Sequence, residues 1–237
     1  MIGAIITGGA LMWTGLTAYG VLHRKSALLA PSIWRGPTDR RTIALTFDDG
    51  PSESTAEILA VLQQYRISAT FFQCGANVRR LPQVAQEVCA AGHELGNHTD
   101  THPRLCFKSP GFIDGELTRA QETIEQVTNT RPTLFRAPFG VRWYGLRGAQ
   151  RRLGLMGVMW TAIGFDWARP AEQVIEILSQ QAMNGAIFCL HDGRETKIKP
   201  DISATIQGLA GLVPMLLDQG FHFETVGSMV RRQRRSA

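Results

Sequence analysis

Short apolar runs alternate with longer amphipathic stretches along most of this chain. The apolar runs predict strands at Thr42–Phe47, Ala69–Cys74, His93–Asn97, Leu134–Arg136, Gly157–Ala162, Ala186–His191 and Phe223–Val226. The amphipathic stretches predict helices at Ser54–Tyr65, Pro82–Ala91, Ile113–Thr128, Gly145–Leu153, Pro170–Met183 and Ile202–Gly220. Regular alternation of this kind predicts an α/β fold built on a parallel sheet.

The number of β/α units limits the possible architectures. About seven units follow residue 41, so a closed or nearly closed barrel competes with an open, doubly wound sheet. No glycine-rich phosphate-binding fingerprint follows the first expected strand, which argues against a nucleotide-binding fold. The chain has 237 residues, and we expect one catalytic domain over residues 41–230.

The segments outside this domain differ from it in composition. Ile2–Leu22 carries no charged side chain and is followed by basic residues. Its length is about the 20 residues that a spanning helix needs, so residues 1–25 are interpreted as an uncleaved, single-pass membrane anchor rather than a surface or packed helix. The side of the membrane is left open. Residues 26–40 are predicted to be a linker and residues 231–237 a basic tail.

Net charge and cysteine usage exclude some functions. The formal charge of +5 and the pI of about 9.3 owe much to arginines in the carboxyl-terminal tail. Without a basic stripe interleaved with aromatic residues, or a nucleic-acid-binding motif, no nucleic-acid partner is expected. The four cysteines show no paired spacing and are interpreted as small core residues rather than as disulfides.

Polar clusters stand just after the carboxyl ends of several expected strands. They are Asp48-Asp49, His98 with His102, Arg136, Asp166-Trp167 and His191-Asp192. Because the carboxyl ends of barrel strands share one rim, we expect these side chains to meet in one pocket.

Two histidines and a pair of acids in this set suggest a metal site. His98 and His102 are four residues apart, which suits chelation of one ion, although an isolated pair is more often structural. One carboxylate from Asp48 or Asp49 would complete a set of two imidazoles and one oxygen, as in open catalytic zinc sites. A surface turn is the alternative for the two acids.

The ordered motifs resemble those of a known family. They are Thr46-Phe47-Asp48-Asp49-Gly50-Pro51, His98-Thr99-Asp100-Thr101-His102-Pro103, Arg136-Ala137-Pro138-Phe139-Gly140, Asp166-Trp167 and Leu190-His191-Asp192. The chain from about Arg41 to Val230 is similar to the polysaccharide deacetylases, also called NodB-homology domains or family 4 carbohydrate esterases. The resemblance implies a distorted, NodB-like (β/α) barrel, here preceded by the amino-terminal hydrophobic helix.

The resemblance also implies a ligand set and a general base. Asp49, His98 and His102 would hold one divalent metal ion, with zinc the first choice and cobalt, nickel or manganese the alternatives. Asp48 would take a proton from the attacking water, and Arg136 would keep Asp48 ionised and aimed.

The resemblance implies further roles around the reacting acyl group. His191 would protonate the departing amine, and Asp166 would orient His191 and favour its protonated form. The backbone N–H of Phe139 would stabilise the negative oxygen of the tetrahedral intermediate. Trp167 would form a wall around the acyl methyl group.

Two departures from the family pattern concern the acyl pocket. Ile163 stands where family members commonly have a second acid. Cys189 replaces the leucine two residues before the family's catalytic histidine. Cys189 and Leu190, together with Phe139 and Trp167, are expected to contact the substrate.

The leading hypothesis is therefore removal of N-acetyl groups from an amino sugar, in a glycan or a lipid-linked saccharide. A related metal-dependent amidase acting on a small non-sugar amide or imide is the second interpretation, because the same catalytic groups serve any planar acyl centre. An inactive carbohydrate-binding domain is the third. Retention of five ionisable site residues argues against it, because a chain without chemistry has no reason to bury them.

Overall fold

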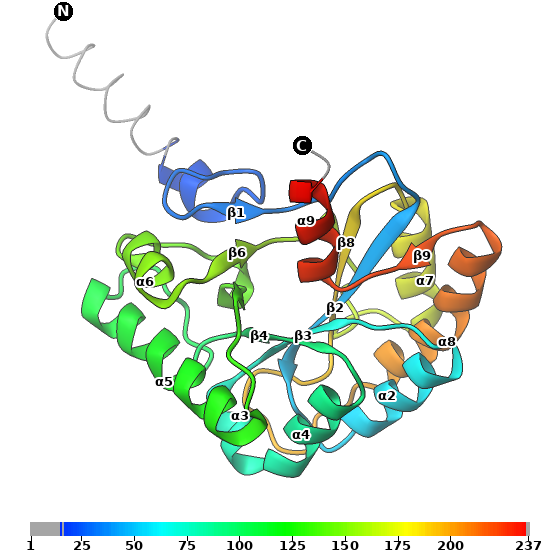
Figure 1. Ribbon diagram of the computed structural model, residues 1–237, viewed down its shortest axis with the longest axis horizontal. Helices are drawn as coiled ribbons and strands as arrows, with labels where there is room; N and C mark the ends of the chain where they lie inside the picture. The colour runs from blue at the N-terminus through cyan, green and yellow to red at the C-terminus, as the bar shows by residue number, and fades with distance from the viewer. Residues whose placement is uncertain (1–14, 16, 236–237) are drawn as a thin grey trace, which may run out of the picture.

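The chain folds around a parallel sheet that curves into an open barrel (Figure 1). The computed structural model describes residue 15 and residues 17–235. The strands of the described part are β1 (Ser32–Ile33), β2 (Thr42–Gly50), β3 (Thr70–Gln73), β4 (Glu94–Asn97), β5 (Leu134–Phe135), β6 (Met156–Val158), β7 (Ala162–Ile163), β8 (Ala186–His191) and β9 (His222–Phe223). Their order is β1-β6-β5-β4-β3-β2-β8-β7, and β9 also pairs with β2.

The sheet confirms the predicted parallel α/β fold, but it forms a half-barrel rather than a closed one. Each recorded strand pair is parallel. Within the described residues, the order ends at β1 on one side and β7 on the other, and no pairing joins these two strands. Both are only two residues long, so the barrel remains open between them.

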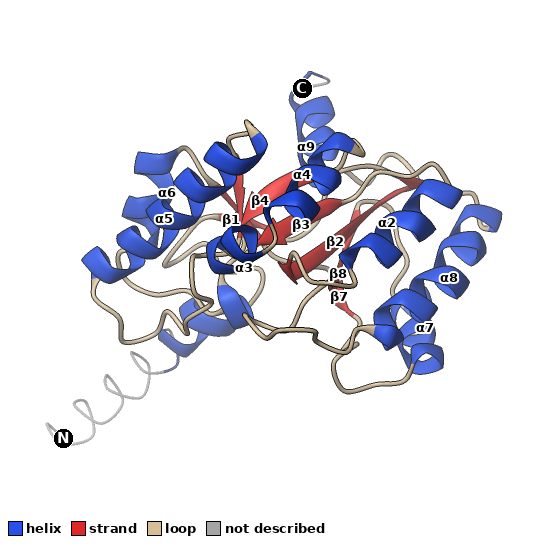
Figure 2. Ribbon diagram, turned by 90° about the horizontal axis from the view of Figure 1, so that it is seen from below, coloured by secondary structure: helices blue, strands red, loops and turns tan. Residues whose placement is uncertain are grey.

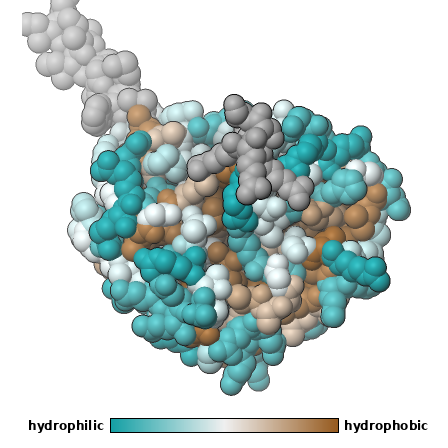
Figure 3. Space-filling model, in the orientation of Figure 1, coloured by the Kyte–Doolittle hydropathy of each residue, from teal (hydrophilic) through white to brown (hydrophobic). Residues whose placement is uncertain are grey.

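Helices surround the sheet, and most of them pack against its outer face. They are α2 (Thr55–Gln64), α3 (Gly75–Arg80), α4 (Pro82–Ala90), α5 (Pro110–Thr128), α6 (Leu146–Leu153), α7 (Ala171–Gln180), α8 (Ser203–Asp218) and α9 (Val226–Arg235), with a short 3-10 turn, η1 (Pro138–Gly140). Helices α5 and α6 lie to one side of the strands, and α2, α7 and α8 lie to the other (Figure 2). On the face shown in Figure 3, hydrophilic residues gather along the rim and hydrophobic residues appear nearer the centre.

Both faces of β2 are buried, and each has its own core. Ile43, Leu45 and Phe47 point outward and pack against the helices. Ala44 points inward, where it packs with residues of β3, β8 and α9. Because side chains alternate along a strand, the inward row continues from Ala44 toward Asp48 at the carboxyl end.

Helix α9 fills the end of the barrel opposite the polar clusters. Val226 and Met229 pack inside with Phe72 and Ile187. Residues 231–235, predicted to belong to a basic tail, continue this helix. The expected strand Phe223–Val226 is correspondingly shorter, since it pairs only with the first two residues of β2 before α9 begins.

Two further segments differ from their predictions. The linker expected at residues 26–40 contributes β1, which pairs with β6, and Ala30 is fully buried. The strand expected at Gly157–Ala162 is two strands, β6 and β7, which pair with different neighbours. The chain between them turns from β5 toward β8, which a single straight strand could not do. The four cysteines are free; Cys74 and Cys189 are buried core residues, whereas Cys89 and Cys106 are only half-buried.

Most of the hydrophobic segment Ile2–Leu22 lies outside the described residues. Its described end is helical at residues 17–22, and Val21 packs with Leu29 and Val141. Among the described residues, no helix has both the length and the apolar character needed to cross a bilayer. The membrane anchor stays a prediction.

A buried histidine gives the fold a testable pH dependence. His93 is 8% exposed, its ring lies 5.2 Å from that of Phe71, and its Nδ1 accepts a hydrogen bond from the Ala69 N–H. Burial lowers the pKa of His93 from 6.5 to about 4.

We expect the free energy of unfolding to fall as the pH is lowered from 6.5 toward 4, because the unfolded chain binds a proton there that the folded chain does not. In His93→Asn an uncharged amide oxygen can accept the same bond, so the fall measured by urea denaturation should be smaller. His222→Asn, at an exposed position, is the control and should behave as wild type. Equal losses in wild type and His93→Asn would contradict this account.

Candidate active site and metal centre

Members of most of the predicted polar clusters line one cavity at the carboxyl ends of the strands, with Arg136 and Asp166 buried directly behind its wall. Its volume is about 700 Å³. Its walls include the side chains predicted to be the metal ligands and the acid–base pair, namely Asp48, Asp49, His98, His102 and His191. Residues spread over more than half of the chain therefore converge, as the shared rim of a barrel requires.

Asp49, His98 and His102 form the first group in this cavity. Oδ1 of Asp49 lies 3.2 Å from Nε2 of His98 and 3.0 Å from Nε2 of His102. This oxygen is buried, yet it has no partner in hydrogen-bond geometry. Burial raises the pKa of Asp49, but His102 and His98 outweigh that effect and hold the pKa well below its usual range.

This arrangement fits a divalent cation. Three ligand atoms lie within 4.8 Å of one another, and the buried oxygen between the imidazoles faces them without a hydrogen bond. His98 Nδ1 is 2.8 Å from the Arg136 carbonyl, which fixes the ring and leaves Nε2 as the coordinating nitrogen. Two imidazoles and one carboxylate leave open positions for water and substrate.

Several site residues have strained backbones. The φ angles of Asp49, His102 and Phe139 are 73°, 58° and 57°, in the left-handed region that residues with a side chain seldom adopt. Such conformations persist only where the surroundings enforce them, and they concentrate at functional sites.

A hydrogen-bond network shapes the loop that carries the two histidines. Glu116 of α5 accepts the backbone N–H groups of Asp100 and Thr101 at 3.1 and 2.8 Å. Asp100 in turn binds Arg79 and Arg119. The loop is therefore held at its middle, between the two imidazoles.

Asp49 is fixed on its other side by two donors. Its Oδ2 accepts a hydrogen bond from the backbone N–H of Glu195 at 2.8 Å, and its backbone carbonyl accepts one from Nδ2 of Asn77 at 2.7 Å. Oδ1 is thus left to face the histidines.

Asp48 forms a buried ion pair with Arg136, as predicted. Nη1 of Arg136 lies 2.7 Å from Oδ1 of Asp48 and 2.7 Å from Oγ1 of Thr46. The guanidinium also donates to the carbonyls of residues 158 and 159 and lies 4.3 Å from the ring centre of Phe72. These contacts compensate the buried charge of an arginine that is 0% exposed.

His191 and Asp166 form the second predicted pair. Nδ1 of His191 lies 2.8 Å from Oδ1 of Asp166, and Oδ2 of Asp166 accepts the His191 backbone N–H and the Thr205 hydroxyl. Burial lowers the pKa of His191, but the charge and hydrogen bond of Asp166 outweigh burial and raise the pKa to about 9. An imidazolium is therefore favoured at neutral pH.

Three of the four predicted substrate contacts line the cavity. Phe139, Trp167 and Cys189 belong to its wall, and the Trp167 ring meets that of His191 edge-on at 4.9 Å. Leu190 does not reach the cavity, because it packs in the core between sheet and helices. Side chains alternate along β8, so Leu190 points away from the face that holds Cys189 and His191.

Other residues of the site were not predicted from the sequence. Trp160 reaches the cavity because the chain leaves the sheet between β6 and β7. Arg104 also lines it, with its guanidinium 4.1 Å from the ring centre of Phe139. Ile163, which the resemblance had already associated with the acyl pocket, lies in the wall beside Cys189, with which it pairs across the sheet. The sequence carries no signal for these residues: Trp160 falls inside the expected strand Gly157–Ala162, Glu116 lies in mid-helix, and Thr205 lies at a helix start.

Comparison with known proteins gives the same answer as the geometry. The polysaccharide deacetylase family model matches residues 35–158. A peptidoglycan-N-acetylglucosamine deacetylase of Bacillus cereus is 34% identical over 202 residues, which are 84% of this chain and 92% of that protein. A chitooligosaccharide deacetylase of a Bradyrhizobium species is 35% identical, over 76% of this chain and 87% of that protein.

A solved structure shares the fold. The crystal structure of the Bc1960 peptidoglycan N-acetylglucosamine deacetylase, in complex with an N-oxidanyl-benzamide, matches with a TM-score of 0.78 and 27% identity. The match covers 84% of this chain and 92% of that one. This chain therefore belongs to the polysaccharide deacetylase family and is a hydrolase of carbon–nitrogen bonds other than peptide bonds.

Proposed function

We propose that this protein removes N-acetyl groups from amino sugars of a glycan or a lipid-linked saccharide, using one divalent cation held by Asp49, His98 and His102. One observation carries the proposal: the three ligand atoms converge beside Asp48 and His191, in the same cavity. Two relatives are named as deacetylases of peptidoglycan N-acetylglucosamine and of chitooligosaccharides, which supports an N-acetylated saccharide as the substrate.

The donor set supports zinc or a similar metal. Imidazole nitrogen suits zinc, cobalt and nickel, and a single carboxylate does not provide the oxygen-rich shell that calcium or magnesium prefers. When bound, such a cation supplies Lewis acidity to the acyl carbonyl and lowers the pKa of water at the site.

Asp48 is the proposed general base. Its Oδ1 is held by Arg136, so Oδ2, which accepts only a long hydrogen bond from the Cys189 thiol, is the oxygen available to take a proton from the attacking water. The buried ion pair with Arg136 also fixes the orientation of this carboxylate.

His191 is the proposed general acid. Asp166 holds Nδ1, so the proton to be donated to the departing amine is that on Nε2. Asp48 and His191 then act in opposite protonation states, which is what acid–base catalysis at one acyl centre needs.

The remaining wall residues fit the acyl group and the sugar. Ile163, Trp167 and Cys189 form an apolar corner for a methyl group next to His191. The exposed faces of Phe139 and Trp167, 43% and 48% exposed, can pack on a sugar ring. We also assign the Phe139 N–H to the developing negative oxygen, a contribution of about 3 kcal/mol for one such donor.

Acetate release from a panel of substrates tests this proposal. Chitooligosaccharides, peptidoglycan fragments and simple amides are compared, and we expect acetate from N-acetylated saccharides. Chelation should abolish release, and zinc or cobalt should restore it. Asp48→Asn should reduce turnover by roughly 10²- to 10⁴-fold. Full activity after removal of all metal would overturn the proposal, and release from simple amides alone would overturn the substrate class.

The pairing of Asp166 with His191 makes a prediction about pH dependence. Asp166 raises the pKa of His191, so Asp166→Asn should lower it, and the protonated acid should be lost at lower pH. We expect the alkaline limb of the kcat/KM profile to move down by roughly one unit or more. Asp201→Asn removes an equal charge from the solvent-exposed margin of the cavity and should leave the limb in place. An unmoved limb in Asp166→Asn would contradict the assignment of the acid.

A further inference from the structure

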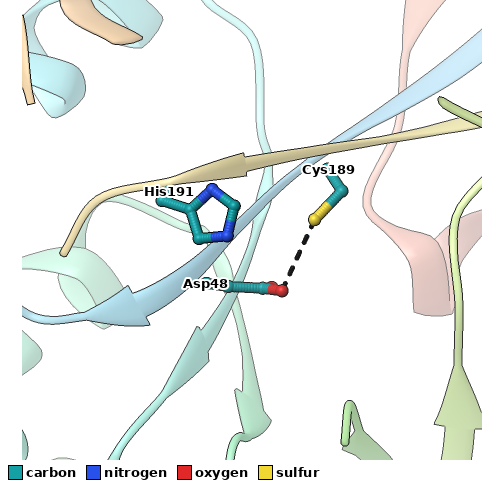
Figure 4. A group of neighbouring side chains, drawn as sticks. All are labelled: Asp48, Cys189 and His191. Atoms are coloured by element: carbon teal, nitrogen blue, oxygen red, sulfur yellow. Dashed lines mark hydrogen bonds between the residues drawn. The ribbon is translucent and has the colours of Figure 1, made fainter. Parts of the chain in front are cut away.

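A second group of metal-ligating side chains lies in the cavity beside the first. Asp48, Cys189 and His191 project from the paired strands β2 and β8, and Figure 4 shows the carboxylate, the thiol and the imidazole gathered together. The register places Asp48 opposite His191 and Thr46 opposite Cys189, so all three groups belong to the inward face. One ligand atom from each lies within 4.8 Å of the others.

The spacing within this group suits a tetrahedral ion. Sγ of Cys189 lies 3.5 Å from Oδ2 of Asp48. A tetrahedral zinc with a Zn–S bond of about 2.3 Å and a Zn–O bond of about 2.1 Å separates its sulfur and oxygen ligands by about 3.6 Å, close to this distance. Nδ1 of His191 is occupied by Asp166, so Nε2 is the nitrogen available as the third ligand.

We propose that Asp48, Cys189 and His191 form a second, inhibitory site for a thiophilic divalent cation such as Cd²⁺ or excess Zn²⁺. The site is distinct from the set made by Asp49, His98 and His102. All three side chains line the cavity, so an ion can enter from solvent. The sulfur ligand selects borderline and soft metals and excludes Mg²⁺ and Ca²⁺.

Charge balance determines how the ion binds. The Cys189 thiol and the His191 imidazolium each lose a proton to solvent, and the thiolate and the neutral Nε2 then coordinate the metal. Arg136, which lies 2.7 Å from the other oxygen of Asp48, opposes a cation here. The new negative charge on Cys189 offsets that repulsion.

Inhibition follows from which atoms the ion would occupy. It would take Oδ2 of Asp48, the oxygen assigned to proton abstraction, and Nε2 of His191, the nitrogen assigned to proton donation. Both catalytic steps would stop at once.

A covalent modification of Cys189 is a weaker interpretation of the same thiol. Burial and the charge of Asp48 raise the pKa of the Cys189 thiol well above its usual value. The thiolate is the reactive form toward oxidants and alkylating agents, so this cysteine is a poor nucleophile. A metal ion, by contrast, displaces the proton as it binds.

The direct test is a Cd²⁺ titration of protein already loaded with one equivalent of zinc. We expect a second bound equivalent by equilibrium dialysis, with an ultraviolet thiolate-to-cadmium charge-transfer band. The second equivalent and the band should both be absent in the variants Cys189→Ala and Cys189→Leu, whose wild-type fold is checked by circular dichroism. Cys74→Ala is the matched control, since Cys74 is the other fully buried thiol near the metal centre, and it should keep both signals.

Inhibition gives a second readout. Cd²⁺ and excess Zn²⁺ should inhibit the wild-type enzyme, whereas Mg²⁺ should not. In Cys189→Leu the Cd²⁺ concentration that halves the rate should be at least about tenfold higher. Each variant is compared with its own uninhibited rate. A second equivalent without the band, or a band that persists in both Cys189 variants, would overturn the site. The spectroscopic readout does not need enzymatic activity, so its failure is distinguishable from failure of the proposed function.

Discussion

The pairing of β2 with β8 is the constraint on which the site depends. Its parallel register sets Asp48 beside His191 and brings Cys189 to the same inward face. A slip of one residue would turn these side chains toward the helices and bring their apolar neighbours into the cavity. Both faces of β2 are packed with apolar groups, so such a slip would bury polar side chains among the helices, and the register is strongly specified.

The carboxylates of the site differ in how their negative charges are compensated. Asp48 has Arg136, and Asp166 has His191. Oδ1 of Asp49 instead lies between the Nε2 atoms of His98 and His102, at 3.2 and 3.0 Å, with no partner in hydrogen-bond geometry. A buried carboxylate between two imidazoles fits a bound cation. A divalent cation held by these three side chains would complete the local charge balance.

The sequence allowed the α/β alternation and the convergence of the polar clusters to be predicted, because both follow from local patterns. Side chains alternate along a strand, so the sequence also indicated that Leu190 faces away from its neighbour His191 and from the cavity. The break between β6 and β7, which exposes Trp160, depends on pairing with two different neighbours and has no local signature. The same holds for Glu116, which reaches the histidine loop from α5.

X-ray absorption at the zinc edge, on protein loaded with one equivalent, tests the central claim most directly. The account predicts nitrogen and oxygen neighbours at about 2.0–2.2 Å, with two imidazoles and no sulfur, and loss of this signal in Asp49→Ala and His102→Ala. Sulfur in the first shell at one equivalent, or an unchanged spectrum in both variants, would contradict it.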